Sequence, residues 1–240
     1  MSRDTFTFDG ISSADYSAYV YATDSMEQAP ARVYDTYTVP GRSGALIVDR
    51  GNFPNVDRDY GIVITEDSAD NISALRNVLA SRSGYCRLTD TFDTQHYFMA
   101  YYHETFSPTM SRDRTLGKAL ISFERKPQRW LLSGEAVTTL TAAGTIDNPT
   151  LFSAQPLLRV TTTRSAASVL GVGSTDITIK RQGVIYIDCA TGRAYNGATP
   201  LDAYIALSTI DFPVLAPGST GISLGTGISK VEITPRWWEL

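Results

Sequence analysis

The sequence of 240 residues is poor in cysteine and histidine, with two of each, and it has no long hydrophobic run. Cys86 and Cys189 lie far apart and outside any CxxC or Cys/His spacing, so the sequence indicates neither a disulfide framework nor a zinc site. We expect both thiols to be reduced and partly buried. No apolar run approaches the roughly 18 residues of a membrane span, and the N-terminal residues lack the apolar segment of a signal peptide. We therefore expect no membrane insertion and synthesis in a cytoplasm.

The scarcity of histidine also limits catalytic chemistry. His96 and His103 are seven residues apart on an expected strand and its following turn, so their side chains should point to opposite faces of a sheet. No GxSxG nucleophile motif is present. Two carboxylate pairs flank expected turns, where aspartate usually caps or shapes the backbone, with glycosidase chemistry as the alternative: Asp57 with Asp59, and Asp90 with Asp93. The sequence predicts no catalytic residue, no cofactor and no metal, and hence no enzyme.

Positive charge is scarce and scattered. The net charge is -4 and the basic residues form no cluster, which argues against binding to duplex DNA. Only 4 of the 21 basic residues are lysine, and the other 17 are arginine. Arginine is favoured at protein interfaces, although a GC-rich genome explains the bias equally well. An interface role is favoured where arginine adjoins aromatic residues, as in Arg129-Trp130 and Arg236-Trp237-Trp238.

The length and the distribution of charge predict two domains, with one large β domain as the alternative. Residues 1–130 contain 14 basic and 17 acidic residues, whereas residues 131–240 contain 7 and 8. A stretch of small polar residues at 138–145 is typical of a segment that few contacts cross. We place the boundary near residue 131, which gives domains of residues 1–130 and 131–240.

The secondary-structure signals are mainly those of β-strands. Only one segment has helical periodicity, with Ile72, Leu75 and Leu79 on one face, Asp67 or Ser68 as N-cap and Gly84 as the stop. Alternating apolar residues predict strands over residues 60–64, 97–102, 119–123, 176–179, 184–187 and 230–234. We expect hairpin turns at Gln182-Gly183 and Thr191-Gly192. The second half has the pattern of an antiparallel sandwich.

The last residues predict a docked C-terminus. Chain ends usually fray unless they are held, yet Trp237 and Trp238 directly follow a strand pattern. Because successive side chains on a strand face opposite ways, one ring should point inward and the other outward. The outward ring either caps its own sandwich or covers a domain or subunit contact.

Several short motifs occur in the order found in the distal tail proteins (Dit) of siphophages and prophages of Gram-positive bacteria, and the chain resembles that family along nearly its whole length. After residue 160 the sequence departs from the family, because Thr161-Thr162-Thr163-Arg164 stands where relatives often have Gly-x-Gly. The motifs are Val39-Pro40-Gly41-Arg42-Ser43-Gly44, Gly84-Tyr85-Cys86-Arg87-Leu88-Thr89-Asp90, His96-Tyr97-Phe98-Met99-Ala100, Lys126-Pro127-Gln128-Arg129-Trp130-Leu131, Asn148-Pro149-Thr150-Leu151-Phe152, Phe212-Pro213-Val214-Leu215 and Pro235-Arg236-Trp237-Trp238.

The resemblance implies an N-terminal β domain with one helix and a C-terminal galectin-like antiparallel β-sandwich. It further implies a structural hub of the tail tip or baseplate, in which N-terminal domains form a hexameric ring. That ring would join the tail tube protein to the tail-associated lysin, fibre or receptor-binding proteins and let DNA pass without binding it. The implied location is the virion, after assembly in the host cytoplasm.

Two further hypotheses accompany the resemblance. The loop from Pro40 to Pro54, with Gly41, Gly44 and Gly51, suits an extended arm, so we expect Arg42 and its neighbours near a subunit contact. The alternative function is carbohydrate binding for host adhesion through the C-terminal domain. The candidate assembly residues are Pro40, Gly41, Arg42, Gly44, Arg129, Trp130, Arg236, Trp237 and Trp238.

Overall fold

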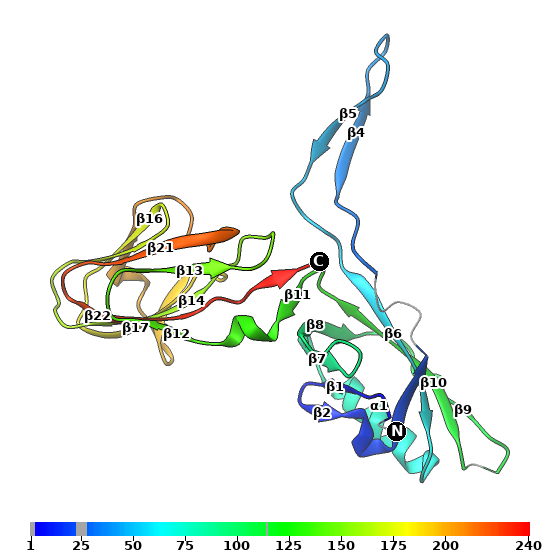
Figure 1. The fold of residues 1–240 in the computed structure, drawn as a ribbon. Helices are drawn as coiled ribbons and strands as arrows, with labels where there is room; N and C mark the ends of the chain where they lie inside the picture. Colours follow the sequence, from blue (N-terminus) through cyan, green and yellow to red (C-terminus); the bar gives the residue numbers. More distant parts are fainter. Residues whose placement is uncertain (1–2, 23–27, 114) are drawn as a thin grey trace. The chain divides into compact units, whose positions relative to one another are not determined.

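The structure is a computed structural model that describes residues 3–22, 28–113 and 115–240. The chain divides into two compact units, residues 1–129 with Leu240 and residues 130–239, which are described separately (Figure 1). Both are built mainly from antiparallel strands, and the described residues contain a single α-helix. The predicted mainly-β fold with one helix is confirmed. No helix in the described part of the chain is long and apolar enough to cross a membrane.

The first unit is built on an antiparallel sheet with the strand order β2-β1-β7-β8-β10-β6-β3. The short strand β9 (Thr109–Met110) also pairs with β10, and the 3-10 helix η1 (Ser13–Tyr16) follows β2. The strands of the sheet are β1 (Phe6–Phe8), β2 (Ile11–Ser12), β3 (Ala18–Ala22), β6 (Val56–Ile64), β7 (Cys86–Asp90), β8 (His96–Tyr102) and β10 (Gly117–Arg125). Two further strands, β4 (Tyr34–Thr38) and β5 (Ala45–Asp49), form a separate hairpin.

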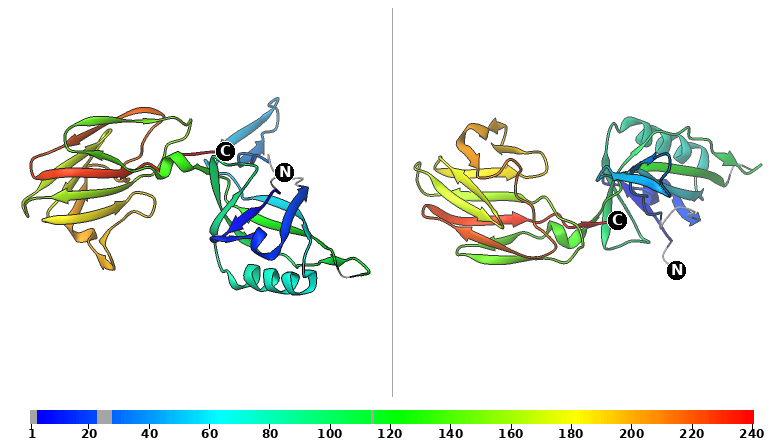
Figure 2. Two further views of the ribbon diagram at one scale, coloured as in Figure 1. Left: turned by 60° about the horizontal axis from the view of Figure 1, so that its bottom comes forward. Right: turned by 90° about the horizontal axis from the view of Figure 1, so that it is seen from above.

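The helix α1 (Ser68–Ser81) lies along one face of this sheet (Figure 2). Its predicted apolar face is buried, with Ile72, Leu75 and Leu79 packed into the core of the unit. Asp67 is the N-cap residue, as predicted, although its side chain makes no capping bond. Gly117 on β10 allows the close approach, because a Cβ atom there would lie 2.7 Å from Ile72 Cδ1. The helical periodicity therefore predicted both the element and its buried face.

The second unit is a sandwich of two antiparallel sheets. The strand orders are β12-β22-β14-β17-β18-β19 and β13-β21-β15-β16-β20. The strands of the first sheet are β12 (Thr138–Leu140), β14 (Leu157–Thr162), β17 (Gly183–Asp188), β18 (Arg193–Asn196), β19 (Thr199–Pro200) and β22 (Ile228–Thr234). Those of the second are β13 (Gly144–Asn148), β15 (Ser168–Val172), β16 (Thr175–Ile179), β20 (Ile205–Leu207) and β21 (Gly218–Leu224). The remaining elements are β11 (Arg129–Leu131), β23 (Trp238–Glu239), η2 (Leu132–Glu135) and η3 (Asp202–Tyr204).

Two local predictions for the second unit are wrong. Gln182-Gly183 is not a hairpin turn, because β16 and β17 belong to different sheets and Gly183 instead opens β17 with φ of 107°. Residues 138–145 are not a linker, since β12 occupies residues 138–140 and β13 begins at Gly144. The hairpin at Thr191-Gly192 is confirmed, with Asp188 paired to Arg193 across it. Small polar residues occur both in linkers and on the exposed face of an outer strand, and composition alone does not separate the two.

Candidate assembly surface

The strands β4 and β5 form an antiparallel hairpin, residues 34–49, that we call the arm. It extends away from the sheet of the first unit (Figure 1). Its register pairs Tyr34 with Asp49 and Thr38 with Ala45, which leaves residues 39–44 as the tip. Gly41 and Gly44 at the tip have φ of 79° and 83°, a conformation that glycine adopts without steric cost. The loop predicted from Pro40 to Pro54 is therefore partly wrong, because Ala45–Asp49 is a strand.

Both faces of the arm expose large apolar side chains. Tyr37 lies opposite Leu46 on one face, and Ile47 lies opposite Thr36 on the other. Tyr37 is 55% exposed and Ile47 is 61% exposed, and Tyr34, Leu46 and Val48 are similarly open to solvent. An isolated two-stranded hairpin is marginally stable in water, and contiguous exposed apolar surface usually marks a binding site. The arm thus has the properties of an element that another protein surface covers.

Charge on the arm lies at its base and at its tip. At the base, Arg50 Nε lies 2.7 Å from Asp35 Oδ2 and Arg32 Nη1 lies 2.6 Å from Asp49 Oδ2. At the tip, Arg42 is exposed, and its amide donates to the carbonyl of Val39 at 3.2 Å. Of the predicted assembly residues, Pro40, Gly41, Arg42 and Gly44 are therefore brought together at one exposed tip.

The predicted pair Arg129 and Trp130 falls at the division between the two units. Arg129 belongs to the first unit, where its Nη1 lies 3.6 Å from Asp93 Oδ2. Trp130 is the first residue of the second unit and is partly buried. Both residues lie on β11, and their part in an interface stays a prediction.

The C-terminal tryptophans are both held within the second unit. Trp237 is buried in the sandwich core. Trp238 is partly buried against the same core, stacks on Phe152 with ring centroids 4.4 Å apart, and donates from Nε1 to the carbonyl of Ser153 at 3.0 Å. Trp238 is therefore packed within its own unit, which agrees with the alternative in which it caps its own sandwich.

Arg236 holds the backbone bend that separates the two tryptophans from the preceding strand. Its φ is 60°, the left-handed region that non-glycine residues seldom adopt. Its guanidinium makes a two-point contact with Asp188, at 2.7 Å to Oδ1 and 3.3 Å to Oδ2. Partial burial acts to raise the pKa of the Asp188 carboxyl, but the hydrogen bond and charge of Arg236 outweigh it and leave that pKa lowered.

We predict an acid-sensitive contribution of this pair to the stability of the second unit. Because the folded pKa of Asp188 is lowered, the contribution is present above the ordinary aspartate pKa of about 3.9 and is lost as pH falls through the lowered value. Asparagine tolerates the left-handed backbone at position 236. We expect Arg236→Asn to lower the free energy of unfolding by about 1 kcal/mol at pH 7. On acidification below pH 4, the variant should lose less of this free energy than the parent does. Urea unfolding at several pH values measures both effects. Arg193→Asn, in an exposed pair with Asp202, is the matched control, and an identical pH dependence of all three proteins would contradict the prediction.

The residues that could carry catalysis do not converge. His96 Nδ1 lies 2.7 Å from Asp93 Oδ1, and the described residues include no group of three or more His, Cys, Asp or Glu that could hold a metal ion. Both cysteines are free thiols. Burial raises the pKa of the Cys189 thiol to about 12, so it is protonated and a poor nucleophile at neutral pH.

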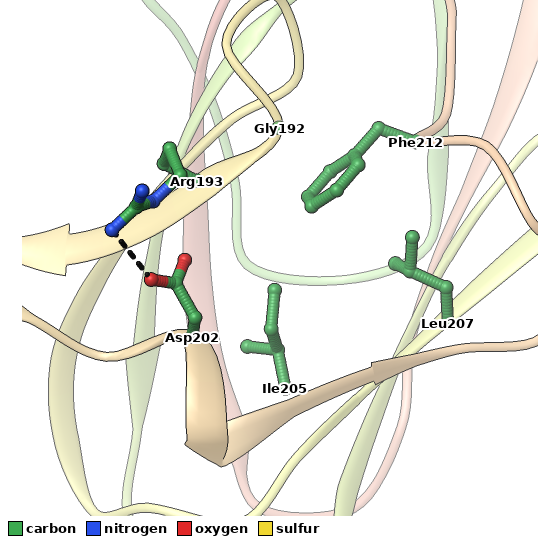
Figure 3. A pocket seen from close by; sticks show the side chains of 6 residues that line it. All are labelled: Gly192, Arg193, Asp202, Ile205, Leu207 and Phe212. Carbon is green, nitrogen blue, oxygen red and sulfur yellow. Dashed lines mark ion pairs between the residues drawn. The ribbon is translucent and has the colours of Figure 1, made fainter.

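The second unit also has a shallow pocket that the sequence did not suggest (Figure 3). Ile205, Leu207 and Phe212 form its apolar side, and Arg193 and Asp202 form an ion pair of 3.0 Å at its rim. The amide of Ala194 donates to Asp202 Oδ1 at 2.7 Å and lowers the pKa of that carboxyl. The one carboxylate of the pocket, Asp202, is held in an ion pair with Arg193 and accepts a backbone hydrogen bond.

Comparison with known proteins identifies which known fold the structure has. No family model matches the sequence, and no curated protein matches it either. The structure of the SPP1 Dit protein, described as a paradigm of the hub adsorption apparatus in phages that infect Gram-positive bacteria, matches with a TM-score of 0.77 over 100% of both chains at 17% identity. The chain has the Dit fold. Two structures of the phage P2 baseplate in its activated conformation, with Ca and with Sr, match this Dit-fold chain with TM-scores of 0.59 and 0.56.

The baseplate matches are at 11% and 10% identity and cover 97% and 96% of this chain and 97% of each matched chain. The Dit fold therefore extends over both units. The resemblance predicted from the ordered motifs is confirmed at the level of the fold.

Proposed function

We propose that this chain is a structural subunit of a phage tail tip and not an enzyme. The full-length match to the SPP1 Dit hub protein carries the proposal, because both units are matched together and not one common sandwich alone. The location we propose is the virion, at the tail tip or baseplate.

We further propose that copies of the chain assemble into a ring, six in number, through the first units. The exposed apolar faces of the arm support assembly, since a second copy is the partner that every such chain is certain to meet. The tip residues Pro40, Gly41, Arg42 and Gly44 would lie near the subunit contact. The ring would join the tail tube protein to lysin, fibre or receptor-binding proteins, and DNA would pass through it without specific binding.

The mass of the purified protein in solution tests this proposal. We expect a species of several times the 26.2 kDa chain mass, formed in a concentration-dependent way, with a central opening in negative-stain images. Arg42→Ala should weaken its formation. A single-chain mass at all accessible concentrations would count against the ring. Rings that form in Arg42→Ala with unchanged concentration dependence would count against the tip contact.

Carbohydrate binding is a second candidate function, and one row of side chains on the second unit favours it. Glu232, Arg159, Tyr186 and Tyr195 are direct cross-strand neighbours on β22, β14, β17 and β18. The rings of Tyr186 and Tyr195 are parallel with centroids 5.7 Å apart, and Arg159 binds both Glu232 and the hydroxyl of Tyr186. Aromatic rings beside paired polar groups suit a sugar, which has apolar and hydroxyl faces.

We expect that, if this row binds sugar, Tyr195→Ala abolishes retention of the protein on cell-wall polysaccharide. Tyr204→Ala, at an exposed tyrosine outside the row, is the matched control and should bind as the parent does. Equal retention of the two variants, or no retention of the parent, would remove this candidate.

A further inference from the structure

The last two residues of β10, Glu124 and Arg125, point to opposite faces of the first unit's sheet. Arg125 is buried on the core face, and Glu124 is half-buried on the other. Their partners on β6 are Asp57 and Val56, the first residues of that strand. Because residues 50–55 connect the arm to β6, both side chains stand where the arm joins the sheet.

Arg125 holds the incoming end of the arm. Its Nη2 donates to the carbonyl of Gln28 at 2.8 Å, and its Nη1 donates to the carbonyls of Lys126 and Pro127 at 3.2 and 3.3 Å. Gln28 is the first described residue of the segment that leads into the arm. Burial, with the nearby charges of Arg58 and Arg129, lowers the pKa of Arg125 to about 10, so it stays charged at neutral pH. No carboxylate among the described residues pairs with it, and backbone carbonyls bind the buried cation instead.

Glu124 holds the outgoing end. Asn55, the last residue before β6, donates from Nδ2 to Glu124 Oε1 at 2.8 Å and to the hydroxyl of Tyr85 at 2.6 Å. The hydroxyl of Tyr101 donates to Glu124 from the other side. The rings of Tyr85 and Tyr101 meet edge to face with centroids 5.2 Å apart. This network lies on the face of the sheet opposite the core.

We infer that Glu124 and Arg125 are positioning residues that fix the two ends of the arm and so set its direction, an inference that rests on the proposed role of the arm in assembly. A hairpin tied at both ends to adjacent residues of one rigid strand has few directions available before a second copy binds. Less conformational entropy is then lost on assembly than for a freely hinged arm. The alternation of side chains along β10 allows one dipeptide to hold both ends.

Limited trypsin cleavage of the protein, diluted to single chains, tests the inference at three arginines. The bonds after Arg32 and Arg50 lie at the two ends of the arm, and the bond after Arg42 lies at its tip beyond the paired residues. Asn55→Ala removes two hydrogen bonds, and at about 1 kcal/mol each their loss raises the locally open population about thirtyfold, which cleavage follows. We expect Asn55→Ala to speed initial cleavage after Arg50 about thirtyfold, and Arg125→Met to speed it after Arg32 by at least as much, with cleavage after Arg42 unchanged in both.

Asn71→Ala is the matched control, since Asn71 makes a similar side-chain bond to the carbonyl of Glu66 away from the arm. Unchanged cleavage after Arg50 in Asn55→Ala overturns the inference, and so does equal acceleration at all three bonds, which reports loss of the whole fold. If Arg125→Met does not fold, cleavage after Arg50 in Asn55→Ala and in Glu124→Gln tests the inference without it.

The same measurement separates the inference from the proposed function. Faster cleavage at the arm ends in a protein that never forms rings supports the positioning role and contradicts the ring. Rings that form normally, together with unchanged cleavage in the variants, contradict the positioning role and leave the ring intact.

Discussion

Asp90→Asn should destabilise the first unit by about 3–5 kcal/mol, the usual cost of removing one partner from a buried ion pair. Asp90 Oδ2 accepts bonds from Arg58 Nη2 at 2.5 Å, from Arg58 Nε at 2.9 Å and from the Tyr60 hydroxyl at 2.5 Å. The Arg58 side chain is 2% exposed and that of Asp90 is 0% exposed. Asparagine would leave the Arg58 charge buried without its counterion.

The choice of asparagine separates charge from backbone shape. Asp90 Oδ1 accepts from the amides of Phe92 and Asp93 at 3.1 and 2.9 Å, and an asparagine oxygen can keep both bonds and the turn. Burial is the largest influence on the Tyr60 hydroxyl and raises its pKa well above the usual value, so tyrosine does not supply the missing negative charge at neutral pH.

Denaturant unfolding, followed by tyrosine fluorescence, measures the loss of stability. The parent, Asp90→Asn and the exposed control Asp113→Asn are compared. The control, whose side chain is exposed, should unfold at a midpoint close to that of the parent. Arg58→Met combined with Asp90→Leu should recover part of the stability, since an apolar pair leaves no buried charge. A parent-like midpoint for Asp90→Asn would show that the pair contributes little.

The double variant Leu46→Asp, Ile47→Asp should prevent assembly while leaving both units folded. Leu46 and Ile47 point to opposite faces of the arm and are 46% and 61% exposed in the single chain, so their loss removes little internal packing. If a second copy covers them, each burial contributes about 2 kcal/mol, or about thirtyfold in the association constant. A charge at either position adds a desolvation cost.

Light scattering across a concentration series compares this variant with the parent, and circular dichroism confirms that it is folded. Ile210→Asp is the matched control, because Ile210 is 99% exposed on the second unit and lies outside the proposed contact. We expect the control to assemble as the parent does. Assembly of the double variant at parental concentrations would show that the arm is not the contact.

The sequence predicted local features better than long-range ones. Ile72, Leu75 and Leu79 recur at helical spacing, so the helix and its buried face could be inferred from neighbours alone. The ion pair of Arg58 and Asp90 could not be, since β6 and β7 are separated by two strands in the sheet and no pattern links the residues. Asp90 was interpreted as a turn former, which is only half of its role.

The secondary structure of the arm was not predicted, for a different reason. Ala45, Leu46, Ile47 and Val48 form a continuous apolar run, and such a run is usually a strand buried on both faces. Here both faces of the strand are exposed, although the apolar composition of the run implies that they are buried. Conflicts of this kind are expected at functional or strained sites, and we propose that a second copy covers the arm. Pro40 and the tip glycines were placed in a loop that suits an extended arm, but the paired strands on either side of the tip were not predicted.

The arm also poses a hazard to the newly made chain. Its two strands pair only with each other among the described residues, so the outer edge of each offers unsatisfied amides and carbonyls beside an uncharged, β-prone tetrapeptide. Asp49 and Arg50 at one end of that tetrapeptide, and the glycine-rich tip at the other, are typical of gatekeepers against amyloid-like stacking. If copies of the chain assemble through the arm, as we propose, correct pairing must be complete before open-ended aggregation begins.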